Sequence, residues 1–320
     1  MSSIVDSIQS ADPAVKVLAG VGAIILATAF LEFLGQVNRQ FIRSGKNLKK
    51  YGKYAVITGA TDGIGKAYAM ALAKKGMSIV LISRTEAKLV AVKEEIDAKN
   101  YADVDVKYIV CDYSKFDDKA KAAVKAGLDG LDIGVLINNV GVSYRYPRFF
   151  HEITDEEVIN LTEMNVNSTV WMTRFVLPQM LEKKKGAIVN ISSGSAMYTL
   201  PLLAQYSAAK SFIEKFTLAL HAEYSSKGVS VQCQIPFYVS TKLAKMRKSF
   251  TVPTPDQFAK LGCKFIGHDD PVVSPYWVHA VMGYFMDRLP SFIVTKGIMS
   301  MHLGIRKRGL KKDAKNAKSE

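Results

Sequence analysis

The sequence predicts an α/β fold: a doubly wound, Rossmann-like, mostly parallel sheet with helices on both faces, preceded by an N-terminal membrane anchor helix. Three observations support this prediction. Short apolar runs alternate with stretches long enough for crossover helices between residues 55 and 234. A glycine-rich turn directly follows the first of these runs. An uncharged apolar segment lies near the N-terminus, ahead of the alternating pattern.

The apolar segment covers residues 14–35, and no charged residue interrupts residues 17–31. As a helix it reaches the length of about 20 residues that a bilayer core requires. The alternatives are a buried core helix and a cleaved signal peptide, and Asp6 and Asp12 argue against a signal peptide because they offset Lys16. We predict a short N-terminal segment at residues 1–13, a membrane anchor at residues 14–35 and a basic linker at residues 36–53.

The net charge of +14 is concentrated in two short segments. Residues 39–53 hold six basic and no acidic side chains, and residues 305–320 hold seven basic and two acidic side chains. Basic clusters beside an apolar segment are attracted to anionic membrane, at roughly 1 kcal/mol per Lys or Arg. No nucleic-acid recognition motif accompanies them. We therefore expect membrane lipid as a partner, no nucleic acid, and a body on the cytosolic side, because positive charge follows the span.

The body contains six short apolar runs that predict strands, at residues 55–58, 78–82, 106–110, 133–137, 187–191 and 229–234. A late apolar run at residues 292–295 is a candidate seventh strand. Five prolines between residues 236 and 275 indicate an insertion over the site, and the apolar run at 276–286 indicates a buried or surface-lying helix. We predict one dinucleotide-binding catalytic domain at residues 54–304, with a substrate region at about 236–290, and a basic tail at 305–320.

The three cysteines, Cys111, Cys233 and Cys263, are too widely spaced for a C-x-x-C metal or redox pattern. Their odd number gives no support to a disulfide framework. We expect reduced core thiols and no metal site.

The glycine-rich turn is TGATDGIG at residues 58–65, and a helical stretch begins at Lys66. Gly59 permits the sharp turn, Gly63 lets backbone approach a pyrophosphate, and Gly65 allows close helix-to-sheet packing. The N–H groups of the helix N-terminus are donors for the anion. The alternative is an ordinary strand-to-helix turn, and the strand before and the helix after argue against it.

The second predicted strand leads to Ser83 and Arg84, where a site for an unphosphorylated ribose ordinarily places an acidic residue. A guanidinium forms paired charged hydrogen bonds with a 2′-phosphate, so Arg84 favours NADPH over NADH. Asp112 follows the third strand and is placed to contact the adenine side. The simpler alternatives are that Arg84 lies in solvent at a strand end and that Asp112 only caps the next helix.

Residues with acid–base chemistry follow the later strands. Tyr206 and Lys210 are four apart, which on a helix places their Cβ atoms about 5–6 Å from each other. A phenol with a pKa of about 10 is a poor acid–base group at neutral pH, and we expect the Lys210 ammonium to lower the pKa of Tyr206. Ser193 would polarise a carbonyl oxygen, and Asn165 would help to hold a water that passes protons to Lys210.

With these motifs the sequence resembles the short-chain dehydrogenase/reductase family. TGATDGIG, NNVG at residues 138–141, Asn165, Ser193 and the Tyr206–Lys210 pair occur in the order typical of that family, over about residues 52–240. The resemblance implies a catalytic tetrad of Asn165, Ser193, Tyr206 and Lys210. It also implies cofactor contacts from the glycine turn and from later loops, at Gly59, Thr61, Asp62, Gly63, Ile64, Gly65, Arg84, Asp112, Asn139, Gly141, Tyr206, Lys210, Val239 and Thr241.

More narrowly, the sequence is similar to the very-long-chain 3-oxoacyl-CoA reductases of microsomal fatty-acid elongation and their 17β-hydroxysteroid dehydrogenase type 12 relatives. The similarity rests on the N-terminal anchor, Val140, residues 190–210, and PFYVST at residues 236–241, where Phe237 replaces the glycine usual in the wider family.

This similarity implies NADPH-dependent reduction of a long-chain 3-oxoacyl-CoA at the endoplasmic reticulum membrane, with the catalytic domain facing the cytosol. It also implies other elongation enzymes as partners, and it is compatible with an oligomer. One alternative is a membrane-bound steroid or retinoid ketone reductase with the same tetrad. An alternative of another class is a noncatalytic membrane-anchored nucleotide-binding scaffold, against which the intact tetrad argues.

Overall fold

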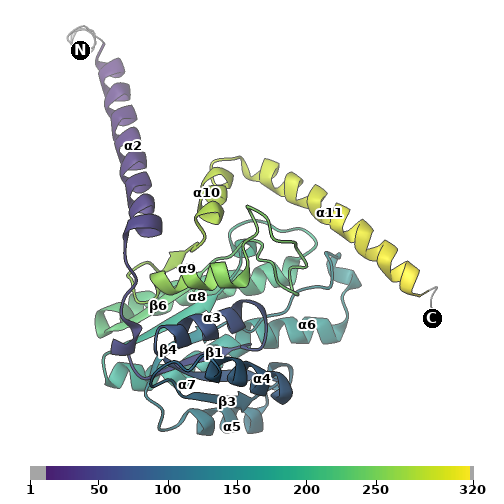
Figure 1. Cartoon of the computed structure of the whole chain (residues 1–320). Coiled ribbons are helices and arrows are strands. Elements are labelled where there is room, and N and C mark those ends of the chain that lie inside the picture. The colour runs from purple at the N-terminus through teal and green to yellow at the C-terminus, as the bar shows by residue number, and fades with distance from the viewer. Residues whose placement is uncertain (1–11, 318–320) are drawn as a thin grey trace. The chain divides into compact units, whose positions relative to one another are not determined.

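The body of the protein, from Gly45 onward, is built on seven parallel strands in the order β3-β2-β1-β4-β5-β6-β7 (Figure 1). The computed structural model describes residues 12–317 of the chain. The strand order reverses between β1 and β4, which pair with each other, and ligands of such sheets bind at the carboxyl ends of the strands near this point. The strands are β1 Tyr54–Thr58, β2 Ser78–Ser83, β3 Val106–Val110, β4 Ile133–Asn138, β5 Gly186–Ile191, β6 Val229–Gln234 and β7 Val272–Val273.

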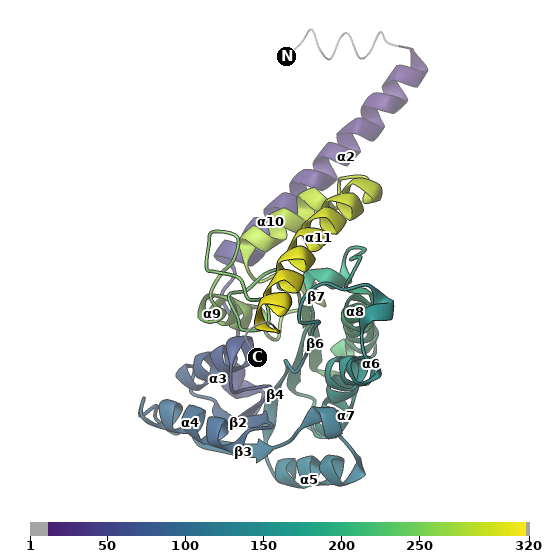
Figure 2. The same ribbon diagram turned by 90° about the vertical axis from the view of Figure 1, so that its right-hand side faces the viewer.

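Helices cover both faces of this sheet, which confirms the predicted fold class (Figures 1 and 2). Alternate residues of β1 supply the two cores: Ala55 and Ile57 pack in one apolar cluster and Val56 in the other. Because both of their faces are buried, the inner strands β1, β2, β4 and β5 are almost continuously apolar, as the sequence indicated. One face packs against α3 Gly63–Lys74, α4 Glu86–Asp97 and α9 Pro255–Phe265, and the other against α5 Asp118–Leu128, α7 Ser168–Glu182 and α8 Ala204–Tyr224.

The helices begin where the sequence places capping residues. Asp62 accepts a hydrogen bond from the Gly63 N–H at the start of α3. A capping box of Thr254 and Gln257 starts α9, with Pro255 in its first turn. A second capping box, formed by Thr154 and Glu157, starts α6 Asp155–Thr162.

The seventh strand is not at residues 292–295, so that prediction is wrong. The seventh strand is β7, whose Val272 and Val273 pair with Cys233 and Gln234 of β6. A strand of two paired residues is too short to produce a periodic signal in the sequence. Residues 292–295 instead lie in α11 Ser291–Asn316, which follows α10 Trp277–Met286. Residues 305–316, predicted to form a basic tail, continue α11 as helix.

The N-terminal unit, up to Ser44, contains α2 Pro13–Val37 and a π-helical turn, η1 Asn38–Ile42. Asp12 caps α2 by accepting a hydrogen bond from the Ala14 N–H at 2.8 Å. No residue of α2 is buried, and Pro13–Ile42 is long and apolar enough to cross a membrane, with a mean hydropathy of 2.2. The helix continues beyond the predicted end at residue 35, because no proline interrupts it there. Residues 1–11 of the predicted N-terminal segment lie outside the described residues.

Candidate active site

The turn after β1 leaves its backbone open at the carboxyl edge of the sheet. Gly59 and Gly63 have φ values of +64° and +54°, a region that favours glycine. The Gly59 N–H donates to the Ile82 carbonyl at 2.8 Å, which fixes the turn to β2. A Cβ atom on Gly65 would collide with the Gly59 carbonyl oxygen. Ile64, between the last two glycines, packs against the apolar core beneath.

The segment after β6 lies on this turn. The Thr241 side chain approaches Gly63 so closely that a Cβ atom there would lie 3.3 Å from Thr241 Cγ2. The next residue, Lys242, forms an ion pair with Asp62 at 2.6 Å, and this hydrogen-bonded pair holds the pKa of Asp62 below its usual value. The Thr241 N–H donates to the carbonyl of buried Val239 at 2.8 Å. The structure thus brings Asp62, Gly63 and Thr241 together.

The end of β4 is tied to the same turn. Asn139 Nδ2 donates to the carbonyls of Thr58 and Gly59, at 3.1 and 3.2 Å. The Asn139 backbone N–H also donates to Thr58 Oγ1 at 3.0 Å. Asn139 therefore holds the glycine turn in place across the point where the strand order reverses.

The predicted adenine-side residues lie at the ends of β2 and β3. Thr61 Oγ1 and Ser83 Oγ are 3.0 Å apart, which places the end of β2 beside the glycine turn, and Arg84 is exposed there. Asp112 accepts hydrogen bonds from the backbone N–H and the hydroxyl of Ser114, at 3.0 and 2.8 Å. Asp112 therefore caps the short helix η3 Tyr113–Lys115, which corresponds to the simpler of its two interpretations.

Tyr206 and Lys210 lie one turn apart on α8. Lys210 is 5% exposed, and its Nζ donates to the Ile191 carbonyl at 3.1 Å. The same Nζ lies 5.9 Å from the centre of the Tyr206 ring. Gly141 lies beneath this cation, because a Cβ atom there would be 3.1 Å from Lys210 Nζ and 2.8 Å from Asn165 Oδ1.

Burial is the main cause of the pKa shifts of both Tyr206 and Lys210. It lowers the pKa of Lys210 to about 8. It also raises the pKa of the Tyr206 phenol, against the opposing effect of hydrogen bonds from Ser193 and Ser195. Contrary to the expectation of a lowered pKa, the pKa of Tyr206 is raised in this structure, because desolvation of the phenolate outweighs the hydrogen bonds from Ser193 and Ser195.

Asn165 is fully buried in a π-helical turn, η5 Glu163–Asn167, between α6 and α7. Its Nδ2 donates to the carbonyls of Val142 and Leu161, both at 2.9 Å. π-Helical turns inside helices are frequent at functional sites. Here the turn directs Asn165 at the loop after β4, where its Oδ1 faces the same glycine as Lys210 Nζ.

Ser193 starts the short helix η6 Gly194–Ala196 directly after β5. Its Oγ accepts a hydrogen bond from the Ser195 N–H at 3.1 Å and also hydrogen-bonds Tyr206. Ser193, Tyr206, Lys210 and Asn165 therefore converge at the carboxyl ends of β4 and β5, beside the glycine turn.

His279 is a residue of the site region that the sequence analysis did not identify. It is fully buried on α10, and its Nδ1 accepts a hydrogen bond from the Phe237 N–H at 3.2 Å. Its Nε2 lies 3.1 Å from the Thr251 carbonyl, and burial lowers its pKa to about 4, so the ring is neutral and Nε2 is the donor. The only sign of His279 in the sequence is that a single histidine interrupts the apolar run at residues 276–286.

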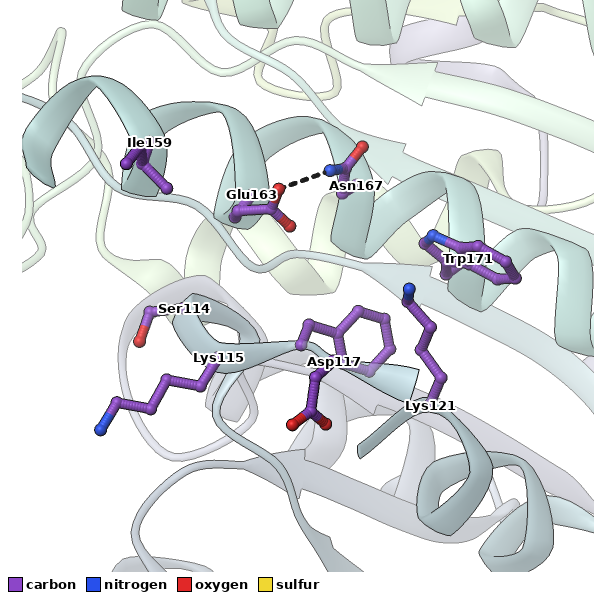
Figure 3. Close-up of a pocket in the computed structure, with 9 residues that line it drawn as sticks. Ser114, Lys115, Asp117, Lys121, Ile159, Glu163, Asn167 and Trp171 are labelled. Atoms are coloured by element: carbon purple, nitrogen blue, oxygen red, sulfur yellow. Dashed lines mark hydrogen bonds between the residues drawn. The ribbon is translucent and has the colours of Figure 1, made fainter. Parts of the chain in front are cut away.

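A separate pocket of about 360 Å³ lies beside η5, and Figure 3 shows its side chains. Lys121 and Trp171 line it, with the Lys121 ammonium 4.6 Å from the Trp171 ring centre. Glu163 accepts a hydrogen bond from Asn167 at 2.8 Å (Figure 3). None of the predicted site residues lines this pocket. Within residues 12–317, no group of three or more His, Cys, Asp or Glu could hold a metal ion.

A family model described as short chain dehydrogenase matches residues 53–251, which contain every predicted site residue. The chain belongs to the short-chain dehydrogenase family. The predicted family is thus confirmed.

Two relatives place this short-chain dehydrogenase in the predicted subgroup. The very-long-chain 3-oxoacyl-CoA reductase-B of Danio rerio is 44% identical over 311 residues, which cover 94% of this chain and 98% of that protein. The very-long-chain 3-oxoacyl-CoA reductase of Homo sapiens is 47% identical over 268 residues, 83% of this chain and 84% of that protein. A solved 7β-hydroxysteroid dehydrogenase has the same fold, with a TM-score of 0.71 and 23% identity over 79% of this chain and 99% of its own.

The residues of this short-chain dehydrogenase fit a dinucleotide cofactor. Gly63 and Gly65 carry no side chain over the turn: a Cβ atom on Gly65 would collide with the Gly59 carbonyl oxygen, and one on Gly63 would lie 3.3 Å from Thr241 Cγ2. The first N–H groups of α3 point to the same edge of the sheet and provide donors for a pyrophosphate. The exposed Arg84 provides a guanidinium at the end of β2.

Proposed function

We propose that this short-chain dehydrogenase reduces a long-chain 3-oxoacyl-CoA to the 3-hydroxyacyl-CoA in fatty-acid elongation, with NADPH as the cofactor. The observation that carries the proposal is the convergence of Ser193, Tyr206 and Lys210 beside the glycine turn. Two relatives that are 44% and 47% identical over most of the chain carry the name of this reductase. The intact acid–base residues argue against a noncatalytic scaffold.

Tyr206 is the proton donor in this proposal. Bound NADPH supplies a hydride to the carbonyl carbon of the substrate. Burial keeps the Tyr206 phenol protonated at neutral pH, so it can give a proton to the carbonyl oxygen as negative charge develops there. Ser193, which hydrogen-bonds Tyr206, donates to the same oxygen and stabilises that charge.

Lys210 restores the proton of Tyr206. Its pKa of about 8 lets the ammonium release and regain a proton near neutral pH. Lys210 Nζ and Asn165 Oδ1 both face Gly141, so a water held by Asn165 can pass protons to Lys210. The two hydrogen bonds that Asn165 donates fix the loop and the helix around this path.

The residues at the glycine turn would hold the cofactor. The backbone from Gly59 to Gly65 and the N-terminus of α3 would bind the pyrophosphate. Arg84 would pair with the 2′-phosphate, because its exposed guanidinium can form paired charged hydrogen bonds. Asp112 would hold the adenine side, and Thr241 and Val239 would hold the nicotinamide half.

The proposed location is the endoplasmic reticulum membrane, with α2 as the anchor and the catalytic domain in the cytosol. The helix has the length and hydropathy of a span, and the basic residues follow it. This side also gives access to NADPH, acyl-CoA and other elongation enzymes. Asn160, Leu161 and Thr162 match the N-x-Ser/Thr pattern of glycosylation, which is used only in the secretory lumen, so they test the orientation. Protein made with microsomes should show no glycan-dependent mobility shift, and a shift would place the domain in the lumen.

The activity is tested with detergent-solubilised full-length protein, NADPH, and a panel of 3-oxoacyl-CoA and ketosteroid substrates, by following nicotinamide absorbance. We expect the highest kcat/KM for long-chain 3-oxoacyl-CoA, with Tyr206→Phe as the inactive control. A higher kcat/KM for a ketosteroid would favour the steroid reductase. NADPH binding without turnover of any substrate would favour the scaffold.

A further inference from the structure

We propose that α10 and the start of α11 form a second membrane contact, which lies in the interfacial region of an anionic bilayer. We call this surface the α10–α11 face, made of Trp277, Val281, Tyr284, Phe285, Leu289 and Phe292, all of which are exposed. The inference rests on the membrane anchoring proposed above for α2, and it goes beyond that single span.

The α10 helix has one buried side and one exposed apolar side. Its inward side is buried through Val278, His279 and Gly283. The outward side repeats apolar residues at the spacing of one helix face, and Phe285 there is 64% exposed. No charged residue occurs between Trp277 and Met286. Contiguous exposed apolar surface of this kind marks an interaction site rather than ordinary solvent-facing surface.

The apolar surface continues past the end of α10. Figures 1 and 2 show α10 and α11 meeting at a turn that projects away from the sheet. Leu289 lies in this turn and Phe292 in the first turn of α11, where it is 62% exposed. Phe250, on the loop before α9, extends the surface, since its ring packs edge-on against Trp277 at 5.7 Å.

Charge identifies lipid as the occupant. Arg247 and Lys248 are exposed beside Phe250, and Lys296 is exposed beyond Phe292. Arg288 lies 3.3 Å from the centre of the Tyr284 ring, so a cation borders the aromatic surface directly. Aromatic side chains with a basic border are typical of helices that lie in the headgroup region of anionic membranes.

Asp287 is the only acidic residue among residues 277–297, and its carboxylate is engaged by a side chain of the body. Asp287 accepts a hydrogen bond from the Tyr198 hydroxyl at 2.9 Å. The same hydroxyl lies 3.2 Å from the Gly283 carbonyl oxygen, and the two acceptors share its single proton, so this contact fastens α10 to the segment that follows Ser193. The α10–α11 face therefore belongs to the same end of the body as the candidate active site.

The α11 helix is held firmly to the body. Arg306 forms a two-pronged ion pair with Glu152, at 2.7 and 2.5 Å. His302 Nδ1 lies 2.6 Å from the Pro201 carbonyl oxygen, and Asp313 accepts a hydrogen bond from Tyr146 at 2.9 Å. The α10–α11 face is thus preformed, so membrane contact requires little ordering of the chain.

The chain itself keeps the body near the bilayer. Only residues 43–47 connect the end of η1 at Ile42 to the short helix η2 Leu48–Lys50, whose Leu48 is buried in the core of the body, and fully extended they span at most about 18 Å. A tether of this length gives the body a high effective concentration at the surface in which α2 is inserted. A modest apolar face with a basic border is then sufficient for docking.

The two tryptophans of the chain provide the test. Trp277 lies on the α10–α11 face, whereas Trp171 lies on α7 beside Lys121 in the pocket of Figure 3. Full-length Trp171→Phe and Trp277→Phe would be reconstituted into phosphatidylcholine–phosphatidylserine vesicles that contain brominated phosphatidylcholine. We expect bromine to quench Trp277 at least roughly twofold more than Trp171. Equal quenching of the two tryptophans would overturn the proposal.

A second pair of variants separates lipid contact from other causes. In the Trp171→Phe background, Phe285→Ser should reduce the quenching of Trp277, whereas Ile159→Ser, a change at a 60% exposed apolar residue of α6, should leave it unchanged. Both variants should still reduce 3-oxoacyl-CoA in detergent, which reports an intact fold. Equal effects of the two changes would contradict the proposal.

Vesicle flotation distinguishes this proposal from the anchor on which it rests. Full-length protein that floats while Trp277 escapes quenching would retain the anchor and overturn the second contact. Protein that fails to float would overturn both. Protection of Trp277 from aqueous iodide without quenching by brominated lipid would assign the face to a second copy of the chain, which also overturns the proposal.

Discussion

The Phe237 ring packs directly against Gly194, the residue after Ser193, and leaves no space for a Cβ atom there. The Gly194 N–H donates to the Pro236 carbonyl at 2.8 Å, so the loop after β5 is tied to the segment after β6. On its other side the Phe237 ring stacks on His279, with ring centres 5.4 Å apart. The position of Ser193 therefore depends on residues far away in the sequence.

This contact predicts that Gly194→Ala lowers kcat by roughly 10²-fold, because the new methyl group displaces either Phe237 or the Ser193 loop. Adding Phe237→Ala should restore part of the loss, since it removes the ring that the methyl group meets. Steady-state reduction assays on both variants test this. Equal loss in the single and double variants would show that the contact does not position Ser193.

Tyr206→Phe should lower kcat by about 10²- to 10⁴-fold, because the ring remains while the proton donor is lost. NADPH binding, followed by nicotinamide fluorescence, should stay near the wild-type level. Near-normal turnover in this variant would remove Tyr206 from the catalytic assignment.

Arg84→Asp should shift the cofactor preference from NADPH towards NADH. The guanidinium attracts a 2′-phosphate, whereas a carboxylate repels it and accepts hydrogen bonds from a free ribose hydroxyl. The measurement is the ratio of kcat/KM for the two cofactors. Lys88→Asp is a matched control, because Lys88 is also exposed near the start of α4. An unchanged ratio in Arg84→Asp would make Arg84 a surface residue only.

The rate of reduction should fall as the pH rises above about 8. Burial lowers the pKa of Lys210 to about 8, so above this pH the lysine loses the proton that it supplies. Tyr206 does not cause this decrease, because burial raises the pKa of its phenol and keeps it protonated. Profiles of kcat from pH 6 to 10 check this, and a constant kcat through pH 9 would contradict the role of Lys210.

The free energy of unfolding should fall as the pH drops from about 6.5 to 4. The pKa of His279 lies at about 4 in the folded chain, so in this window the unfolded chain binds a proton that the folded chain does not. The loss from this residue is about 3 kcal/mol at pH 4. Denaturant unfolding of His279→Gln should show a smaller loss over the same window. A loss equal to that of the wild type would assign the effect to other groups.

The strands and the glycine turn were predictable because their signals are local. Six of the seven strands lie at the predicted positions. The inner strands β1, β2, β4 and β5 are buried on both faces and are therefore apolar along most of their length. The Gly59–Gly65 turn and the four-residue spacing of Tyr206 and Lys210 likewise lie within short stretches of the sequence. Family resemblance then supplied Asn165 and Ser193, which lie elsewhere in the sequence.

Long-range packing decided the features that the sequence alone did not show. The two residues of β7 are a strand only because β6 lies beside them, and residues 292–295 are helical because they continue α11. The proton affinities of Tyr206 and Lys210 depend on the burial that the loops and helices around them impose, which spacing along α8 does not reveal. The sequence by itself therefore determined the fold class, the glycine turn and the placement of Tyr206 and Lys210 one helical turn apart. Only the tertiary structure decided how Phe237 and His279 support Ser193, because those contacts join segments more than forty residues apart.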